Sequence, residues 1–466
     1  MEFQQFYLSC LAHASYLVGS EGIAAIVDPQ RDVDIYIEEA ARRGLRIQHI
    51  IETHLHADFV SGHVELARRT GARIYLGAQA GATFPHVPVQ DGEEVRFGRV
   101  VLRFLETPGH TPESICVVVT DLDRSEKPWA ALTGDTLFIG DVGRPDLSPN
   151  HTPQQLAALL YDSLHSKLLT LPDGVLVYPA HGAGSLCGRQ MSTDLFSTIG
   201  TQRTLNYALR AASKDEFVRL LTDDLPERPG YFLRDAAINR SGAPALSDLP
   251  PLLGLSPAAF EAKRSEGLIV LDTRPAAKYL PAHIPGSVHI ALGGQFASWA
   301  GALLGVDARL LLVAEDSAAV EETRMRLARV GIEKLEGYLE GGILAWQKAH
   351  LPLASIPEIT VEELHQRMRA DEALQVLDVR RQGEWDSGHI AGAVLKPLNN
   401  LEKNLDGLDP ARPLAVQCQG GYRSAIAASL LRRAGFQNVI NIAGGFSAWT
   451  TCKLPVAPTS SVPACH

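Results

Sequence analysis

The stretch IQHIIETHLHADF (47–59) decides the fold of the first half of this chain. Its apolar first part predicts a buried strand, and His54, His56 and Asp58 follow at the point where that strand ends. Loops at strand ends are where α/β folds expose catalytic groups. The stretch therefore predicts an α/β domain whose polar side chains gather beside a sheet.

The same alternation of strand and helix extends on both sides of this stretch. The pattern predicts strands at 22–29 and 100–110, and helices at 32–44 and 62–71. Further on, RSGAPALSDLPPLLGLSP (240–257) has the composition of a linker between domains. The first domain is therefore expected to end at about residue 245, inside this linker.

Three later segments place ligand candidates in the same kind of loop. His110 lies in TPGHTPES, Asp135 in ALTGDTLF and His181 in VYPAHGAG, each after an apolar run. A transition metal needs several imidazole or carboxylate donors that converge from different loops. The chain offers four such loops in order, so we expect a metal site.

The candidate donors fall into two sets. Ligation is the favoured interpretation for three of them: His54, His110 and Asp135. For the other three, a hydrogen bond to a ligand is as good an interpretation as ligation itself: His56, Asp58 and His181.

The ordered segments HLHADF, TPGHT, TGD and AH resemble those of the metallo-β-lactamase superfamily. The resemblance implies an αββα sandwich over residues 1–245. Phe59 departs from the family signature HxHxDH, because it stands where binuclear hydrolases carry a histidine for a second metal. A phenyl ring cannot ligate a metal, so we expect a mononuclear site.

Within this superfamily the sequence resembles the persulfide dioxygenases, which hold one iron by two histidines and one aspartate. The resemblance implies one Fe(II) per chain on His54, His110 and Asp135, although the same donors suit zinc, which the purified protein could carry. Such a triad leaves positions open for a thiolate persulfide and for dioxygen. The resemblance also implies that Arg144 contacts the anionic substrate; a surface arginine is the alternative.

The second half of the chain contains an internal repeat. LIVLDTR (268–274) matches LQVLDVR (374–380) and AHIPGSV (282–288) matches GHIAGAV (388–394), both at an offset of 106. A repeat of this kind predicts two consecutive α/β domains. We expect them at 254–355 and 356–457, followed by a disordered tail at 458–466.

The loop LAVQCQGGYRS (414–424) carries the second chemical signal. Cys418 lies between an expected strand and an expected helix, where backbone N–H groups and the helix dipole favour a reactive thiolate. Gly421 permits a tight loop, and Arg423 adds a positive charge that could bind a sulfite-like anion. An ordinary buried cysteine would not require these neighbours.

This loop resembles that of the rhodanese family, whose active cysteine opens a loop of the form CxxGxR. The resemblance implies transfer of sulfane sulfur through a persulfide on Cys418. At an offset of 103, read from GGILAW (341–346) and GGFSAW (444–449), Cys418 falls on Glu315 and Arg423 on Val320. The first repeat is therefore expected to be an inactive rhodanese-like domain that serves as a spacer, a docking surface or an oligomer contact.

Composition narrows the function classes. The 466 residues carry a net charge of −10, which argues against nucleic-acid binding and against an anionic membrane surface. No apolar run is long enough to span a membrane, and the first residues do not have the pattern of a signal peptide. The six cysteines form no CxxC pair, which favours free thiols in the cytoplasm. Cys187 could be an inert buried thiol or could face the metal site, and Cys10 has the same alternatives.

These expectations combine into one hypothesis about function. The metal site would oxidise a low-molecular-weight thiol persulfide with O2 to sulfite and thiol. Cys418 would exchange sulfane sulfur with sulfite and thiosulfate, in sulfide detoxification by a homodimer or homotetramer. The alternatives are a glyoxalase II-like thioester hydrolase with sulfurtransferase domains, and a non-catalytic sulfur carrier.

Overall fold

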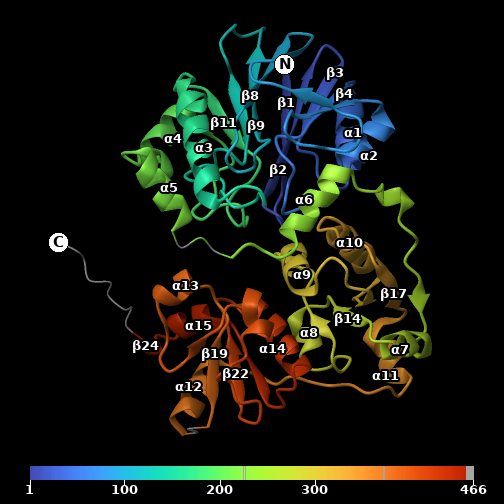
Figure 1. Cartoon of the computed structure of the whole chain (residues 1–466). Coiled ribbons are helices and arrows are strands. Elements are labelled where there is room, and N and C mark those ends of the chain that lie inside the picture. The colour runs from blue at the N-terminus through green and yellow to red at the C-terminus, as the bar shows by residue number, and fades with distance from the viewer. Residues whose placement is uncertain (224, 226, 371–372, 458–466) are drawn as a thin grey trace, which may run out of the picture. The chain divides into compact units, whose positions relative to one another are not determined.

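The computed structural model describes residues 1–223, 225, 227–370 and 373–457. The chain forms two compact units, one of Met1–Pro250 with Met325–Glu333 and one of Pro251–Arg324 with Lys334–His466 (Figure 1). The predicted disordered tail at 458–466 lies outside the described residues.

The first unit is built on two six-stranded sheets. In spatial order, the first sheet consists of β1 (Glu2–Leu8), β2 (His13–Ser20), β3 (Ile23–Val27), β4 (Arg46–Ile51), β5 (Arg73–Gly77) and β6 (Val87–Val89). The second consists of β12 (Ser197–Thr198), β11 (Leu176–Pro179), β10 (Ala130–Gly134), β9 (Ile115–Asp121), β8 (Val100–Glu106) and β7 (Glu94–Phe97). The helical segments are α1 (Asp34–Arg42), α2 (His63–Thr70), α3 (Pro153–Ser166), η1 (Leu168–Thr170), α4 (Ile199–Leu205), η2 (Ala208–Arg210), α5 (Lys214–Thr222), α6 (Phe232–Ser241) and η3 (Leu246–Asp248).

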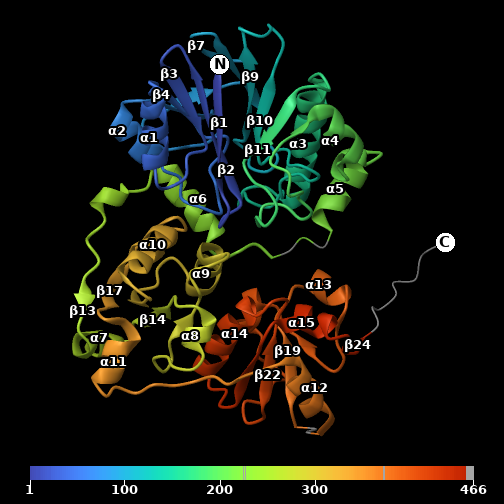
Figure 2. The ribbon, with the colours of Figure 1, turned by 180° about the vertical axis from the view of Figure 1, so that it is seen from behind.

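Three apolar cores hold these layers together. Neighbouring residues of a strand point to opposite faces of its sheet, so Val27 joins the core between the two sheets while Ile26 packs toward α1 and α2. In the second sheet, Val117 and Val118 divide in the same way, and Val118 packs toward α3 and α5. Helices therefore lie on the outer faces of both sheets, as both views show (Figures 1 and 2). This arrangement confirms the predicted αββα sandwich.

The second unit contains two five-stranded parallel sheets with the same strand order. The first repeat has β13 (Gly254–Leu255), β17 (Leu335–Leu339), β16 (Leu310–Val313), β14 (Ile269–Asp272) and β15 (Val288–His289), with α7 (Pro257–Ser265), α8 (Ala276–Tyr279), α9 (Phe296–Leu304), α10 (Ser317–Ala328) and α11 (Gly342–Lys348). The second repeat has β18 (Glu358–Ile359), β23 (Val439–Ile442), β22 (Leu414–Gln417), β19 (Gln375–Asp378) and β21 (Val394–Leu395), with α12 (Val361–Ala370), α13 (Gln382–Asp386), η4 (Leu398–Lys403), α14 (Tyr422–Arg433) and α15 (Gly445–Thr451). The short strands β20 (His389–Ile390) and β24 (Val456–Ala457) pair with each other.

The sheet register corrects one detail of the repeat alignment. Asp272 pairs with Val313 in the first repeat, and its equivalent Asp378 pairs with Gln417 in the second. The residue after each of these partners is Ala314 and Cys418, so Ala314, and not Glu315, is the counterpart of the cysteine. The one-residue error arose because the offset was taken from the later tryptophan helices. The first repeat has no thiol at this place.

Candidate metal centre and sulfur-transfer loop

The three favoured ligand candidates come from three loops of the first unit. His54 follows β4, His110 follows β8, and Asp135 follows β10. One ligand atom from each residue lies within 4.8 Å of the others, and all three side chains are buried. His110 Nε2 lies 3.3 Å and His54 Nε2 lies 3.8 Å from Asp135 Oδ2.

These converging atoms fit a metal ion. His54 Nε2, His110 Nε2 and Asp135 Oδ2 are buried and have no hydrogen-bond partner. Buried polar atoms without partners are costly, and a metal ion in this place would satisfy all three. Two imidazoles and one carboxylate also form the donor set typical of a non-haem Fe(II) site with open positions.

The electrostatics of the three groups suit metal binding. Burial lowers the pKa of His54 well below its ordinary value and also lowers the pKa of His110. Burial opposes ionisation of Asp135, but His181, His54 and His110 hold the pKa of its carboxyl well below the ordinary value. Neutral imidazoles and an ionised carboxylate are the protonation states that a metal ion requires.

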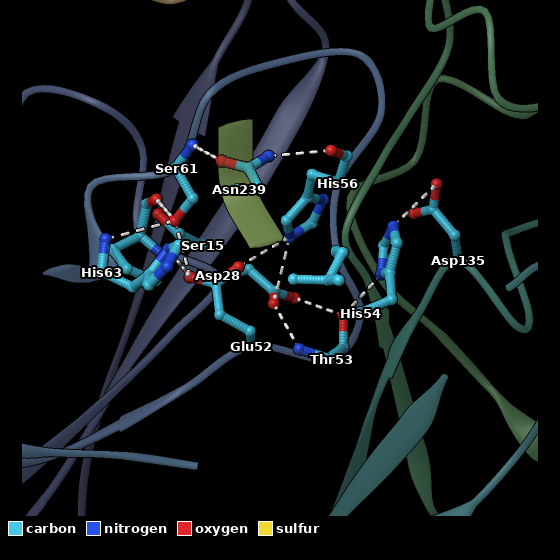
Figure 3. A network of polar contacts seen from close by, with 12 residues as sticks. Ser15, Asp28, Glu52, Thr53, His54, His56, Ser61, His63, Asp135 and Asn239 are labelled. Carbon is cyan, nitrogen blue, oxygen red and sulfur yellow. Dashed lines mark hydrogen bonds and ion pairs between the residues drawn. The ribbon is translucent and has the colours of Figure 1, made fainter. Parts of the chain in front are cut away.

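Each histidine ligand is oriented through its other ring nitrogen. His54 Nδ1 lies 3.0 Å from Thr53 Oγ1, and that hydroxyl donates to Asp28 Oδ2 at 2.9 Å. The backbone N–H of Thr53 donates to Asp28 Oδ1 at 2.7 Å, so one carboxylate fixes Thr53 twice (Figure 3). His110 Nδ1 lies 3.0 Å from the Arg144 carbonyl oxygen. Both rings are therefore held with Nε2 toward the ligand cluster.

Gly134 makes room for this orienting contact. A Cβ at that position would lie 2.5 Å from Thr53 Oγ1, and the residue has a φ of +53°. Any side chain there would push Thr53 away from His54. Sequence reasoning passed over Asp28 and Thr53, although Asp28 ends the apolar run GIAAIV in the same way that His54 ends its strand.

His56 belongs to a polar network with two buried carboxylates. Its Nε2 lies 3.2 Å from Asp28 Oδ1 and 3.5 Å from Glu52 Oε2 (Figure 3). Although burial opposes it, Asp28 and Glu52 raise the pKa of His56 above its ordinary value. Glu52 also accepts a hydrogen bond from Ser61 at 2.6 Å and lies 3.4 Å from His63 Nδ1. The structure thus places His56 among carboxylates, and His56 also forms a second group with Asp58 and His181 whose candidate ligand atoms lie within 4.8 Å of one another.

His181 joins the remaining candidates. Its Nδ1 lies 2.7 Å from Asp135 Oδ1 and its Nε2 lies 2.9 Å from Asp58 Oδ2. Although burial opposes protonation, Asp135 and Asp58 raise the pKa of His181 well above its ordinary value. His181 therefore connects the Asp135 carboxylate, through a hydrogen bond, to Asp58, through an ion pair.

Phe59 is fully buried beside these groups. Its ring centroid lies 4.2 Å from that of His13 and 4.4 Å from that of His56. His13 was not among the sequence candidates, and neither of its ring nitrogens has a hydrogen-bond partner. Phe59 thus adds no donor atom to the neighbouring group of His56, Asp58 and His181, whose candidate ligand atoms lie within 4.8 Å of one another.

Two further residues lie close to the cluster. Cys187 is buried, and its Sγ lies within 4.8 Å of ligand atoms of Asp135 and His181. Burial raises the pKa of the Cys187 thiol well above its ordinary value. Arg144, the candidate substrate contact, forms a two-pronged ion pair with Asp146 at 2.6 and 2.8 Å and donates to the Leu186 carbonyl at 3.2 Å. Its role toward substrate stays a prediction.

The sulfur-transfer loop lies in the second unit, between β22 and α14. Cys418 is buried, and its Sγ accepts a hydrogen bond from the backbone N–H of Gly421 at 3.1 Å. Gly421 has a φ of +99°, a left-handed conformation that glycine adopts without strain, and the helix begins directly after it. The cysteine sulfur therefore faces the N-terminal end of α14, as the sequence predicted.

The Arg423 side chain, the candidate anion-binding group of the loop, forms an ion pair with a carboxylate of the chain. Its guanidinium donates to both carboxylate oxygens of Glu384, at 2.7 and 2.6 Å. Arg380 is held in the same two-pronged way by Asp378 and also donates to the Gln419 side chain at 3.3 Å. The Arg423 pair joins α14 to α13 and the Arg380 pair lies at the end of β19, and an anion that bound Arg423 would compete with Glu384.

The helices give no sign of a membrane segment. Among the residues that the structure describes, no helix combines the length and the apolar character needed to cross a bilayer.

Comparisons with known proteins match one family to the first part of the chain and another family to the two repeats. A model of the metallo-beta-lactamase superfamily matches residues 8–181, and a model of the rhodanese-like domain matches residues 256–349 and 360–452. The mitochondrial persulfide dioxygenase ETHE1 of Bos taurus is 34% identical over 215 residues, which cover 44% of this chain and 75% of the relative.

A hydroxyacylglutathione hydrolase of Francisella tularensis is 30% identical over 183 residues, covering 39% of this chain and 68% of the relative. A crystal structure of a metallo-beta-lactamase from Staphylococcus aureus covers 73% of this chain and 98% of its own, with 32% identity and a TM-score of 0.66. The similarity in three dimensions thus extends well beyond the first domain.

Proposed function

Because this chain belongs to the metallo-β-lactamase superfamily, with homology to the persulfide dioxygenases and with two rhodanese-like domains, we propose that it oxidises low-molecular-weight thiol persulfides and transfers sulfane sulfur. The observation that carries the first activity is the cluster of three unpartnered donor atoms from His54, His110 and Asp135. The cluster suits a single metal ion, because Phe59 provides no further ligand.

The proposed oxidation converts RSSH, O2 and H2O into RSH, sulfite and two protons. His54, His110 and Asp135 would hold one Fe(II), which would supply the redox chemistry of the oxidation. The residues of the chain hold the geometry. Asp28 and Thr53 orient His54, the Arg144 carbonyl orients His110, and His181 donates to Asp135. Burial of all these groups limits the access of bulk water.

The proposed sulfur transfer uses Cys418 as the nucleophile. Its thiolate attacks the outer sulfur of a persulfide, releases the carrier thiol and becomes a cysteine persulfide. Sulfite then attacks the outer sulfur of that group, which regenerates the Cys418 thiolate and yields thiosulfate. The reverse sequence would consume thiosulfate. The Gly421 N–H and the start of α14 stabilise the thiolate in either direction.

An oxygen electrode combined with metal analysis tests the first activity. Protein purified without oxygen and loaded with Fe(II) should consume O2 only when a thiol persulfide is added, and should release sulfite. His110→Ala is the matched loss-of-ligand variant and should abolish both. Iron-loaded protein that consumes no oxygen with any persulfide tested would contradict the proposal.

Similarity to a hydroxyacylglutathione hydrolase supports a second candidate, hydrolysis of a glutathione thioester. That activity would proceed without oxygen. Two zinc ions per chain, together with thioester turnover under anaerobic conditions, would favour this alternative over the oxidation. Phe59 argues against it, because it supplies no ligand to a second metal, which would depend on His56, Asp58 and His181 alone.

A further inference from the structure

Helix α14, which begins at the sulfur-transfer loop, is buried along most of its length. Eight consecutive residues, Ser424–Leu431, are buried. A helix on the surface of a domain normally exposes one face to water, and the equivalent helix α10 does so with Ser317, Ala318, Glu321 and Glu322. The sheet of its own repeat covers only one face of α14, so another part of the unit must cover the other.

The first repeat supplies that cover. Helix α14 contacts β22 and β23 of its own sheet, the neighbouring segment η4, and β15 of the first repeat. The backbone N–H of His289 in β15 donates to Ser429 Oγ at 3.0 Å, and both residues are buried. Both views show α14 beside the first repeat (Figures 1 and 2). Small side chains at 425, 427 and 428, all alanine, allow this close approach.

The contact between the two repeats also includes a residue of the sulfur-transfer loop. Tyr422 lies between Gly421 and Arg423, and its hydroxyl donates to the Ala291 carbonyl of the first repeat at 2.8 Å. A Cβ built at Gly294 would lie 3.6 Å from the Tyr422 ring, so the ring lies close to this glycine of the first repeat. Tyr422 is the first residue of α14, so this anchor fixes the point at which the loop becomes helix.

We infer that the first repeat, which has Ala314 in place of a nucleophile, positions the sulfur-transfer loop of the second repeat, with Tyr422 as the positioning residue. Cys418 depends on the Gly421 N–H, and Gly421 directly precedes the anchored tyrosine. Release of Tyr422 from Ala291 would let the first turn of α14 move relative to β22. The thiolate would then lose part of its hydrogen bonding. This inference rests on the proposed role of Cys418 in sulfur transfer.

Tyr422→Phe in the full-length protein tests the inference, since it removes only the hydroxyl that reaches Ala291. The pH dependence of Cys418 alkylation by iodoacetamide, followed on the Cys418 peptide by mass spectrometry, reports the thiolate. We expect the midpoint to move to higher pH and thiosulfate turnover to fall about fivefold, the ratio that corresponds to one hydrogen bond of about 1 kcal/mol. Tyr338→Phe, in β17 of the same unit, is the matched control and should change neither.

The outcomes separate this inference from the proposed function. A Tyr422→Phe protein with the alkylation midpoint and the turnover of the parent protein would overturn the inference. A parent protein that transfers no sulfur would instead contradict the role of Cys418, while the alkylation midpoint would still decide whether Tyr422 positions the loop. Ser429→Ala provides a second variant, because it loses the acceptor for His289 without altering the loop, and a smaller shift in the same direction is expected. An unchanged midpoint in both variants would also overturn the inference.

Discussion

At the scale of single residues, Thr53 illustrates how one hydroxyl joins a carboxylate to a metal ligand. It donates to Asp28 and lies within hydrogen-bond distance of His54 Nδ1. No pattern in the sequence separates this threonine from others, because its role depends on Asp28, which is 25 residues away in the chain. The candidate ligands could be chosen from the sequence, since each follows an apolar strand, and the structure brings their ligand atoms within 4.8 Å of one another. The side chains that orient them become visible only when the strands are assembled.

The Thr53→Val variant should bind metal more weakly. Valine keeps the shape of the side chain but offers His54 Nδ1 no acceptor, so the ring would no longer be held in one tautomer. We expect a loss of about 10–100-fold in affinity, measured by competition with a chelator. Thr53→Ser keeps the hydroxyl and should retain most of the affinity. Equal affinities for the valine and serine variants would argue against this role.

Phe59→His should change the metal content of the first unit. The new imidazole would stand beside Asp58 and His181, which already lie within ligand distance of each other. We expect the zinc content after saturation to rise from one toward two ions per chain, measured by elemental analysis. Phe59→Leu is the control, because it removes the ring without adding a donor. One zinc ion in the histidine variant would mean that more than Phe59 prevents a second site.

At the scale of elements, the sequence predicted well where strands and helices lie along the chain. It did not predict which elements pack against them. The strand expected at 22–29 is β3 (Ile23–Val27), and the helix expected at 62–71 is α2 (His63–Thr70). Both follow from hydrophobic periodicity, which is local. The burial of Ser424–Leu431 in α14 was not predictable in this way. The face of the helix that its own sheet leaves open is covered by β15, which is far away in the sequence. The alignment of the two repeats was wrong by one residue, at Ala314, for a similar reason. Only the pairing of the strands fixes which residue corresponds to Cys418.

His289, in β15, should make the second unit less stable toward unfolding as the pH falls. Burial lowers the pKa of His289 from 6.5 to about 3, so the folded protein keeps this ring neutral. In the unfolded chain the ring is protonated below its ordinary pKa, and the unfolded state therefore binds more protons between these two values. The stability that His289 contributes is complete above about pH 6.5 and falls as the pH decreases toward 3.

Urea unfolding at pH 7 and at pH 5 measures this effect. The parent protein should lose more stability between these conditions than His289→Gln, which cannot titrate. Other groups also titrate in this range, so the difference between the two proteins is the informative quantity. Identical losses would show that His289 does not contribute to the acid sensitivity.

At the scale of the whole molecule, the metal cluster and the cysteine loop belong to different compact units. Each has its own set of orienting contacts, and none of the described contacts of Cys418 involves a ligand residue. The two proposed activities should therefore be separable by mutation. Joining them in one chain raises the effective concentration of one site's product at the other.

Cys418→Ser should abolish sulfur transfer and leave persulfide-dependent oxygen consumption largely intact. His110→Ala should have the opposite effect. Both variants can be assayed with the same persulfide, with an oxygen electrode for the first activity and thiosulfate production from added sulfite for the second. A parallel loss of both activities in the serine variant would contradict the two-site description.

The burial of residues 424–431 in α14 has a consequence for any attempt to use the second repeat by itself. A segment of residues 356–457 carries the whole CQGGYR loop and resembles a portable catalytic module. Cut from the chain, however, it would expose the helix surface that contains Ser429 and would leave the Tyr422 hydroxyl without its Ala291 acceptor. Anyone who wishes to graft this sulfur-transfer activity onto another protein should therefore transplant both repeats together, beginning at Gly254, and should treat the repeat without the cysteine as part of the catalytic cassette.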